Sequence, residues 1–194
     1  MLDSSEEMLS FAFKSLIKKG DAKEYQRNIY IKDQSINIKE RDIRKQILIH
    51  LSTNPNCNLS ACLALISISK DAERLGDYVK NLFELQSLLK DSKSNRKLFK
   101  KLFDENGKDL LELFEKVTIS FKSSDRELAS AAITEGREIS KRCEEIIEEV
   151  IVSDYSNRQA VVLALGARYM KRIALHLSNI ASSVVNPLTD LDYV

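Results

Sequence analysis

Residues 65–82 read LISISKDAERLGDYVKNL, with apolar side chains recurring at steps of three and four. The series comprises Leu65, Ile68, Ala72, Leu75, Val79 and Leu82. Because an α-helix turns once every 3.6 residues, these steps place the series along one helix face. A helix with a continuous apolar face must bury it against other helices. The stretch therefore predicts a long helix inside a helical bundle.

Glycine and proline are scarce in the rest of the chain as well. The 194 residues include 5 glycines and 2 prolines, roughly 4% together, whereas globular proteins average about 12%. A β-sandwich or barrel needs turn residues about every 8–12 positions, so an all-β fold is excluded. Glycine-rich phosphate loops of α/β proteins are also disfavoured, and we predict an all-α fold.

The charge is nearly balanced, with 30 basic and 29 acidic residues and a formal net charge of +1. Such a chain has no general field for collecting nucleic acid, so we expect no nucleic-acid partner. No apolar run approaches the ~18 residues of a membrane span, and residues 1–7 lack the features of a signal peptide. We expect a cytoplasmic protein.

Five polar breaks divide the chain into six predicted helices of about 17–32 residues each. Each break resembles a helix end followed by a capping residue, such as Ser124 or Asp125 before a new apolar series. The breaks fall at residues 19–21, 52–56, 91–95, 123–125 and 152–154.

The two halves of the chain repeat each other. Residues 74–82 align with residues 172–180 at an offset of 98 residues, and Arg74 and Asn81 recur as Arg172 and Asn179. The apolar stripe recurs at the same offset, as Leu163, Met170, Ile173, Leu177 and Ile180. Ordered recurrence of three helices predicts two tandem three-helix bundles, residues 1–92 and 93–194, with a polar hinge near residues 91–95.

Catalytic motifs are missing from the sequence. No HExxH, GxSxG, Walker or Rossmann pattern occurs. His50 and His176 lack the glutamate three residues earlier that di-iron bundles use, and each is expected to lie on a helix face or between helices. Cys57, Cys62 and Cys143 show neither CxxC nor zinc-knuckle spacing, which is typical of a reducing compartment. We therefore expect no enzyme.

Two groups of oxygen-bearing side chains stand out in the first unit. Glu73 and Asp77 are four residues apart and lie on one helix face, away from the apolar stripe. The preceding helix offers Asp33, Asn37 and Glu40 at steps of four and three. If the two helices run antiparallel across the short 54–55 turn, these groups meet and can form an all-oxygen metal site. The alternative is that they are solvated or paired with Arg74 or lysines.

Residues 71–82, DAERLGDYVKNL, resemble the signature helix of the PhoU family. Residues 33–40, DQSINIKE, resemble that family's segment on the neighbouring helix. The resemblance spans nearly the whole chain and implies a negative regulator of phosphate uptake that links a phosphate transporter to a sensor kinase. It also implies surface metal clusters of iron or zinc. By position, the implied ligands are Glu73, Asp77, Asp33 and Asn37, with an amide where the family usually has aspartate.

The second unit loses this pattern, because Lys171 and Leu175 stand where the first unit has Glu73 and Asp77. We expect one metal site rather than two, and none beside Lys171. An exposed Leu175 would be covered by a partner or by a second copy in a homodimer. The alternative is burial by a neighbouring helix.

Basic residues form two local clusters. One comprises Lys14, Lys18, Lys19 and Lys23, and the other comprises Arg96, Lys97, Lys100 and Lys101. Either cluster can contact anionic lipid, giving peripheral membrane association, or an acidic partner. The alternative is an ordinary solvated helix end.

The sequence therefore predicts a metal-binding, PhoU-like regulator of phosphate transport. Two alternatives remain: the soluble domain of a sodium/phosphate symporter, and a helical adaptor without metal.

Overall fold

The computed structural model describes residues 1–17, 22–88 and 93–186, and these residues form six helices without any strand. The helices are α1 (Leu2–Ile17), α2 (Ala22–Thr53), α3 (Leu59–Leu88), α4 (Lys93–Ser123), α5 (Arg126–Ile151) and α6 (Asn157–Val185). The predicted all-α class and the six helices are confirmed. Lys18 and Lys19 of the first basic cluster lie outside the described residues.

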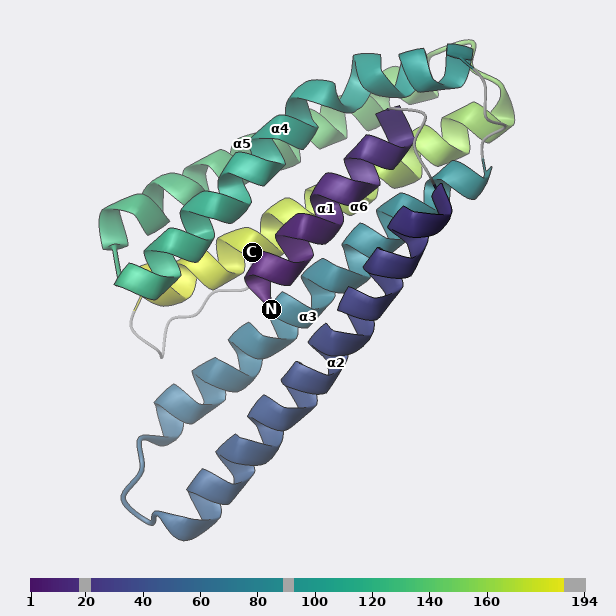
Figure 1. The fold of residues 1–194 in the computed structure, drawn as a ribbon. Helices are drawn as coiled ribbons and strands as arrows, with labels where there is room; N and C mark the ends of the chain where they lie inside the picture. The colour runs from purple at the N-terminus through teal and green to yellow at the C-terminus, as the bar shows by residue number, and fades with distance from the viewer. Residues whose placement is uncertain (18–21, 89–92, 187–194) are drawn as a thin grey trace.

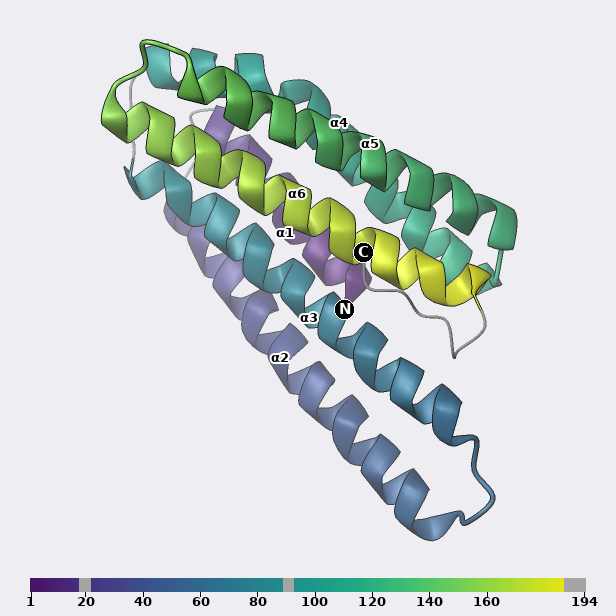
Figure 2. The same ribbon diagram turned by 180° about the vertical axis from the view of Figure 1, so that it is seen from behind.

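Four helices form the centre of the bundle (Figures 1 and 2). There α1 and α6 each contact both α3 and α4. The long helix α2 packs outside on α1 and α3, and α5 packs outside on α4 and α6. The second three helices thus repeat the arrangement of the first three, and one apolar core contains side chains from all six.

The structure confirms the predicted cap at Asp125 and adds a cap at the start of α6 that was not predicted from the sequence. Asp125 caps α5, since its carboxylate accepts a hydrogen bond of 3.0 Å from the backbone N–H of Leu128. Ser124 instead takes a left-handed conformation, with φ of 55°, which turns the chain between α4 and α5. At α6, Ser156 and Gln159 form a reciprocal capping box.

The predicted hinge near residues 91–95 is in part helical. Residues 91 and 92 lie outside the described residues, whereas residues 93–95 already form the first turn of α4. The two repeats share one apolar core, so the fold does not separate them into independent domains. The boundary between residues 92 and 93 therefore stays a prediction from the sequence repeat.

Two members of the predicted apolar stripe are not buried, since Ile68 is half-buried and Leu65 is exposed. Leu65 is 47% exposed, whereas Leu75, Val79 and Leu82 are buried, as is Leu163 at the equivalent place in α6. The difference arises because the joined ends of α2 and α3 extend past the other helices (Figure 1). No described helix combines the length and the apolar character needed to cross a membrane.

The crossing of α5 on α6 depends on Gly136. A Cβ atom at this position would lie 2.1 Å from Ser178 Oγ and 3.2 Å from the backbone oxygen of Ala174. Both are closer than ordinary van der Waals contact, so a side chain here requires Ser178 to give up its hydrogen bond to Ala174.

We predict that Gly136→Ala lowers the free energy of unfolding by about 1 kcal/mol, because overpacking exceeds the gain in helix propensity. Urea denaturation measures the change. Adding Ser178→Ala, which removes the closest atom, should restore part of the loss. A double variant as unstable as Gly136→Ala alone would contradict this account.

Candidate functional site

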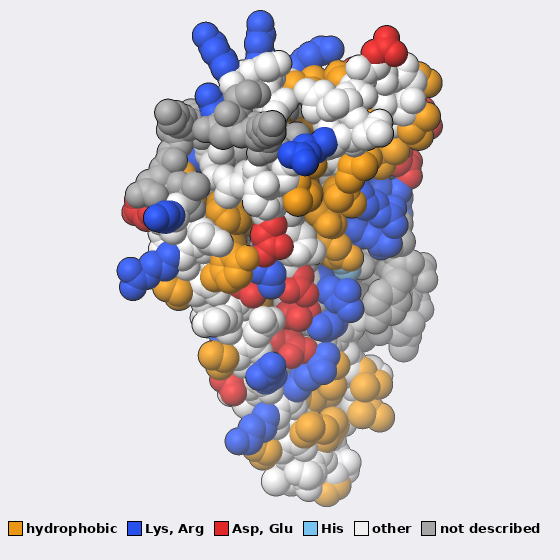
Figure 3. Space-filling model, turned by 90° about the vertical axis from the view of Figure 1, so that its right-hand side faces the viewer, with side chains coloured by type: hydrophobic (Ala, Val, Ile, Leu, Met, Phe, Trp, Pro, Cys, Tyr) orange, Lys and Arg blue, Asp and Glu red, His pale blue; other side chains and the backbone are white. Residues whose placement is uncertain are grey.

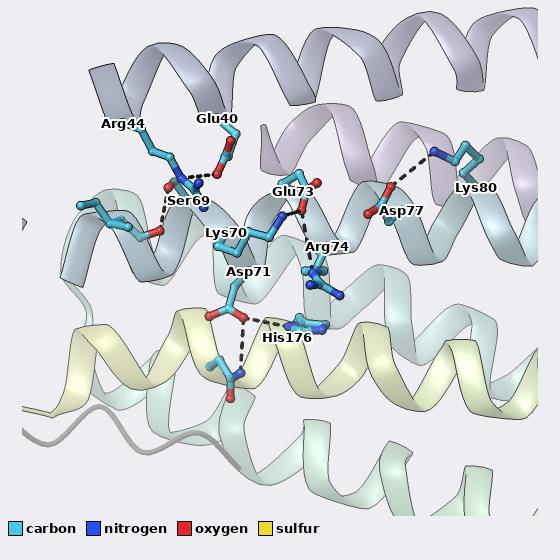
Figure 4. Close-up of polar contacts among 12 residues, drawn as sticks. Glu40, Arg44, Ser69, Lys70, Asp71, Glu73, Arg74, Asp77, Lys80 and His176 are labelled. Atoms are coloured by element: carbon cyan, nitrogen blue, oxygen red, sulfur yellow. Dashed lines mark hydrogen bonds and ion pairs between the residues drawn. The ribbon is translucent and has the colours of Figure 1, made fainter. Parts of the chain in front are cut away.

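The predicted ligands lie along the seam between α2 and α3. Glu73 and Asp77 share one side of α3, with Asp71 on the side that faces α6 (Figure 4). The Asp77 side chain is 38% exposed, but that of Glu73 is only 14% exposed. The helix face away from the apolar stripe is therefore open to solvent at Asp77 and largely covered at Glu73. Asp33 is buried and Asn37, one turn further along α2, is half-buried.

Gly76 allows α2 to approach α3 at this point. A Cβ atom on Gly76 would lie 3.1 Å from Ile36 Cδ1 and 3.9 Å from Asp33 Oδ1. Because Gly76 has no side chain, Ile36 packs directly against α3. The Asp33 carboxylate, one turn earlier on α2, then also lies next to α3.

Lys80 joins the two helices at the centre of the seam. Its Nζ atom lies 2.8 Å from Asp33 Oδ2 and 3.4 Å from Asp77 Oδ1. Burial by itself lowers the pKa of Lys80, but the hydrogen bonds and negative charges of Asp33 and Asp77 outweigh burial and raise it above its usual value. The two carboxylates thus meet as predicted, but around an ammonium group of the protein itself.

The remaining carboxylates of the seam also have cationic partners. Lys70 Nζ lies 2.6 Å from Glu73 Oε2, and Arg74 Nε lies 4.0 Å from the same oxygen. Arg44 Nε lies 2.5 Å from Glu40 Oε1. The sequence left open that the carboxylates pair with lysines or with Arg74. The structure contains these ion pairs. Figure 3 shows acidic and basic side chains interleaved along the middle of one face.

The equivalent place in the second repeat differs, as the sequence predicts. Lys171 forms an ion pair with Glu144 of α5. Leu175 is half-buried rather than exposed, because α6 packs among α3, α4 and α5. Leu175 therefore needs no partner protein or second copy to cover it, because neighbouring helices of the same chain do so.

A polar cluster connects α3 to α6. His176 Nδ1 lies 2.8 Å from Asp71 Oδ1, and Asn179 Nδ2 lies 3.5 Å from the same oxygen. Tyr78 stacks on the His176 ring with centroids 5.5 Å apart. The expectation that His176 lies between helices is confirmed (Figure 4).

Sequence reasoning missed a second cluster, at the joined ends of α2 and α3. His50, Cys57 and Cys62 place one potential metal-ligand atom each within 4.8 Å of the others. Among the described residues, no other group of three or more His, Cys, Asp or Glu side chains does so. In the sequence these residues are spaced His-x6-Cys-x4-Cys across the connection between α2 and α3. This spacing matches no common zinc motif, so the sequence alone did not reveal the cluster.

The third cysteine has a different environment. Cys143 is buried in α5, and burial raises the pKa of its thiol to about 12. A thiol held neutral in this way is a poor nucleophile and a poor metal ligand.

These features define a duplicated six-helix protein with a charged seam on its first repeat. The family described as PhoU domain matches residues 1–85 and 103–184, and the chain therefore belongs to the PhoU family. No curated protein sequence matches it.

Solved structures of the same fold agree with this assignment. PhoU from Pseudomonas aeruginosa superposes with a TM-score of 0.78 at 17% identity, covering 94% of this chain and 89% of that chain. The phosphate transport system regulatory protein PhoU from Streptococcus pneumoniae gives 0.76 at 19% identity, covering 100% and 93%. At these identities the likeness establishes the fold.

We predict that Lys80→Met lowers the free energy of unfolding at neutral pH by about 1–3 kcal/mol, because it leaves the buried Asp33 carboxylate without a counter-charge. Urea denaturation measures the loss. Since folding raises the pKa of Lys80, its contribution to stability is complete below the usual lysine pKa of 10.5 and is lost only as the pH rises through the higher pKa of the folded state.

Lys70→Met is the matched control, because Lys70 pairs with a neighbour one turn along its own helix and its side chain is 40% exposed. Its loss should be about 0.5 kcal/mol or less. Equal losses of unfolding free energy in Lys80→Met and Lys70→Met would show that the Lys80 ion pairs stabilise the fold no more than an exposed ion pair does.

Proposed function

We propose that this protein regulates phosphate transport. The observation that carries the proposal is the match of the PhoU domain to both helical repeats. It is supported by the likeness to a phosphate transport system regulatory protein over 100% of the chain.

The regulation works by binding partner proteins rather than by catalysis. The seam between α2 and α3 consists of carboxylates paired with cations, which are groups suited to binding a charged surface. Alternating charges along an exposed seam suit the recognition of a charged partner surface. The partners proposed are a phosphate transporter and a sensor kinase on the cytoplasmic side, with the basic helix ends assisting contact with the membrane.

The alternative that the chain is the soluble part of a sodium/phosphate symporter places the same surface beside a membrane domain. Genomic context separates the two proposals, because a coding region with upstream membrane spans favours the symporter.

Removal of the gene from its source cell tests the regulatory role. We expect phosphate uptake and phosphate-starvation gene expression to stay high when phosphate is plentiful, and the wild-type gene to restore repression. Affinity capture with the tagged protein should recover transporter or kinase components. Unchanged uptake and unchanged gene expression in the deletion strain would refute the proposal.

The finer part of the proposal is an iron or zinc ion held by Glu73, Asp77, Asp33 and Asn37. The seam supplies three carboxylates and an amide oxygen, which suit a hard or borderline cation. The described residues of the seam do not gather three carboxylates as closely as the His50 cluster gathers its ligands, so these side chains must move to share one ion. The ammonium of Lys80 already neutralises two of these carboxylates, so a metal ion there must displace it. A metal ion and the Lys80 ammonium therefore compete for the same carboxylates. We expect the metal to bind more weakly here than at carboxylates without a cationic partner.

We predict that Glu73→Ala/Asp77→Ala abolishes metal uptake at the seam and that Lys80→Met increases it. Elemental analysis after equilibration with iron or zinc measures both changes. The comparison is made in a Cys57→Ser/Cys62→Ser background, so that the two thiols near His50 do not contribute. Sub-stoichiometric metal that neither change affects would leave the seam as a metal-free binding surface.

A further inference from the structure

The joined ends of α2 and α3 bring together three side chains with the chemistry of a zinc site. His50 lies in the last turn of α2, Cys57 in the connection and Cys62 in the first turns of α3. Their potential ligand atoms all lie within 4.8 Å of one another. We propose that His50, Cys57 and Cys62 bind one Zn²⁺ ion.

The connecting segment holds these residues in place. The backbone N–H of Cys57 donates to the backbone oxygen of Asn54 over 3.1 Å, which closes a four-residue turn with Pro55 at its second position. Asn58 then caps α3, since its Oδ1 accepts from the backbone N–H of Ala61 over 3.0 Å. Two local hydrogen bonds thus fix where Cys57 lies relative to the helix that carries Cys62.

The distances suit a small tetrahedral ion. With Zn–S bonds of about 2.3 Å, two thiolates on a tetrahedral zinc lie about 3.8 Å apart. Side chains already within 4.8 Å reach this separation by rotamer adjustment of about 1 Å or less. Two sulfurs and an imidazole nitrogen select a thiophilic ion such as zinc over magnesium or calcium. Three protein ligands leave the fourth position to water or to another ligand.

Asn54 is placed to orient the histidine. Its side-chain amide lies 3.2 Å from His50 Nδ1, and its Nδ2 also donates to the His50 backbone oxygen over 3.1 Å. When Asn54 Nδ2 donates to His50 Nδ1, the ring proton lies on Nε2. Zinc therefore binds either through Nδ1, in place of the amide, or through Nε2 after Asn54 turns its Oδ1 to accept from Nδ1–H.

The site is separate from the carboxylate seam and does not depend on the proposed function. It uses no residue of the seam, and it lies where the α2–α3 pair extends beyond the other four helices (Figure 1). Loss of zinc at this end would leave the Lys80 ion pairs intact.

Zinc titration of the full chain tests the proposal. The protein is stripped of metal, kept reduced with a phosphine, and titrated with Zn²⁺ in competition with a chromophoric chelator. In a Glu73→Ala/Asp77→Ala background, which removes the seam carboxylates, we expect one equivalent to bind, with affinity reduced at least tenfold when Cys57→Ser or His50→Ala is added. His50 is exposed and Cys57 is half-buried, so both variants should fold, and circular dichroism verifies their helix content.

One matched variant should retain the affinity of the unmodified site. Cys143→Ser removes only the buried thiol of the second repeat. Substitution by Co²⁺ gives a direct signature, because thiolate ligation produces a charge-transfer band that Cys57→Ser should weaken. Equal zinc affinity with and without Cys57→Ser in the background that lacks the seam carboxylates, or no zinc uptake by that background protein when reduced, would overturn the proposal.

Oxidation provides an independent measurement. Bound zinc should slow air oxidation of Cys57 and Cys62, in which O₂ accepts two electrons and two protons as the two thiols join in a disulfide. The reason is that thiolates coordinated to zinc are less available to the oxidant. A Cys57–Cys62 disulfide that forms at the same rate with and without zinc would contradict a shared metal site.

Discussion

The packing of α3 against α6 holds the two helical repeats together. Each of these helices has an apolar stripe, and the stripes include Leu75, Val79, Ile173 and Leu177, all of them buried. Burial of such a side chain contributes roughly 1.5–3 kcal/mol to the free energy of unfolding. A repeat on its own would leave part of its stripe exposed and lose part of this contribution. The outer helices α2 and α5 then cover the remaining faces. The order of the whole bundle thus depends on one central helix pair.

A single polar cluster interrupts that apolar interface. A buried carboxylate is costly unless it is paired and hydrogen-bonded, and Asp71 obtains both His176 and Asn179 as partners from α6. Sliding α6 by one turn would leave Asp71 without these partners. The cluster therefore restricts the register of the two repeats, which apolar packing alone restricts only weakly.

Periodicity predicted the helices and the duplication because both are local or repeated properties of the sequence. It also placed Asp33 near Asp77, because the short connection between α2 and α3 forces an antiparallel pair. The position of Lys80 could not be predicted in this way, since a long side chain reaches across helices by rotamer choice. The exposure of Leu65 depends on where the other helices end, and the partial burial of Leu175 depends on the helices that pack around α6. The cluster of His50 with two cysteines required the geometry of the connection itself.

The extension of α2 and α3 past the other helices makes the bundle mechanically uneven. Near that end Leu48, Ile49, Leu59 and Leu63 are each more than half exposed, so few buried contacts hold the two helix ends together. Regions with few such contacts open locally at a small free-energy cost while the core stays folded. Backbone amides there should exchange with solvent well before those of α6. Any ligand that binds only the closed form would slow this exchange by mass action.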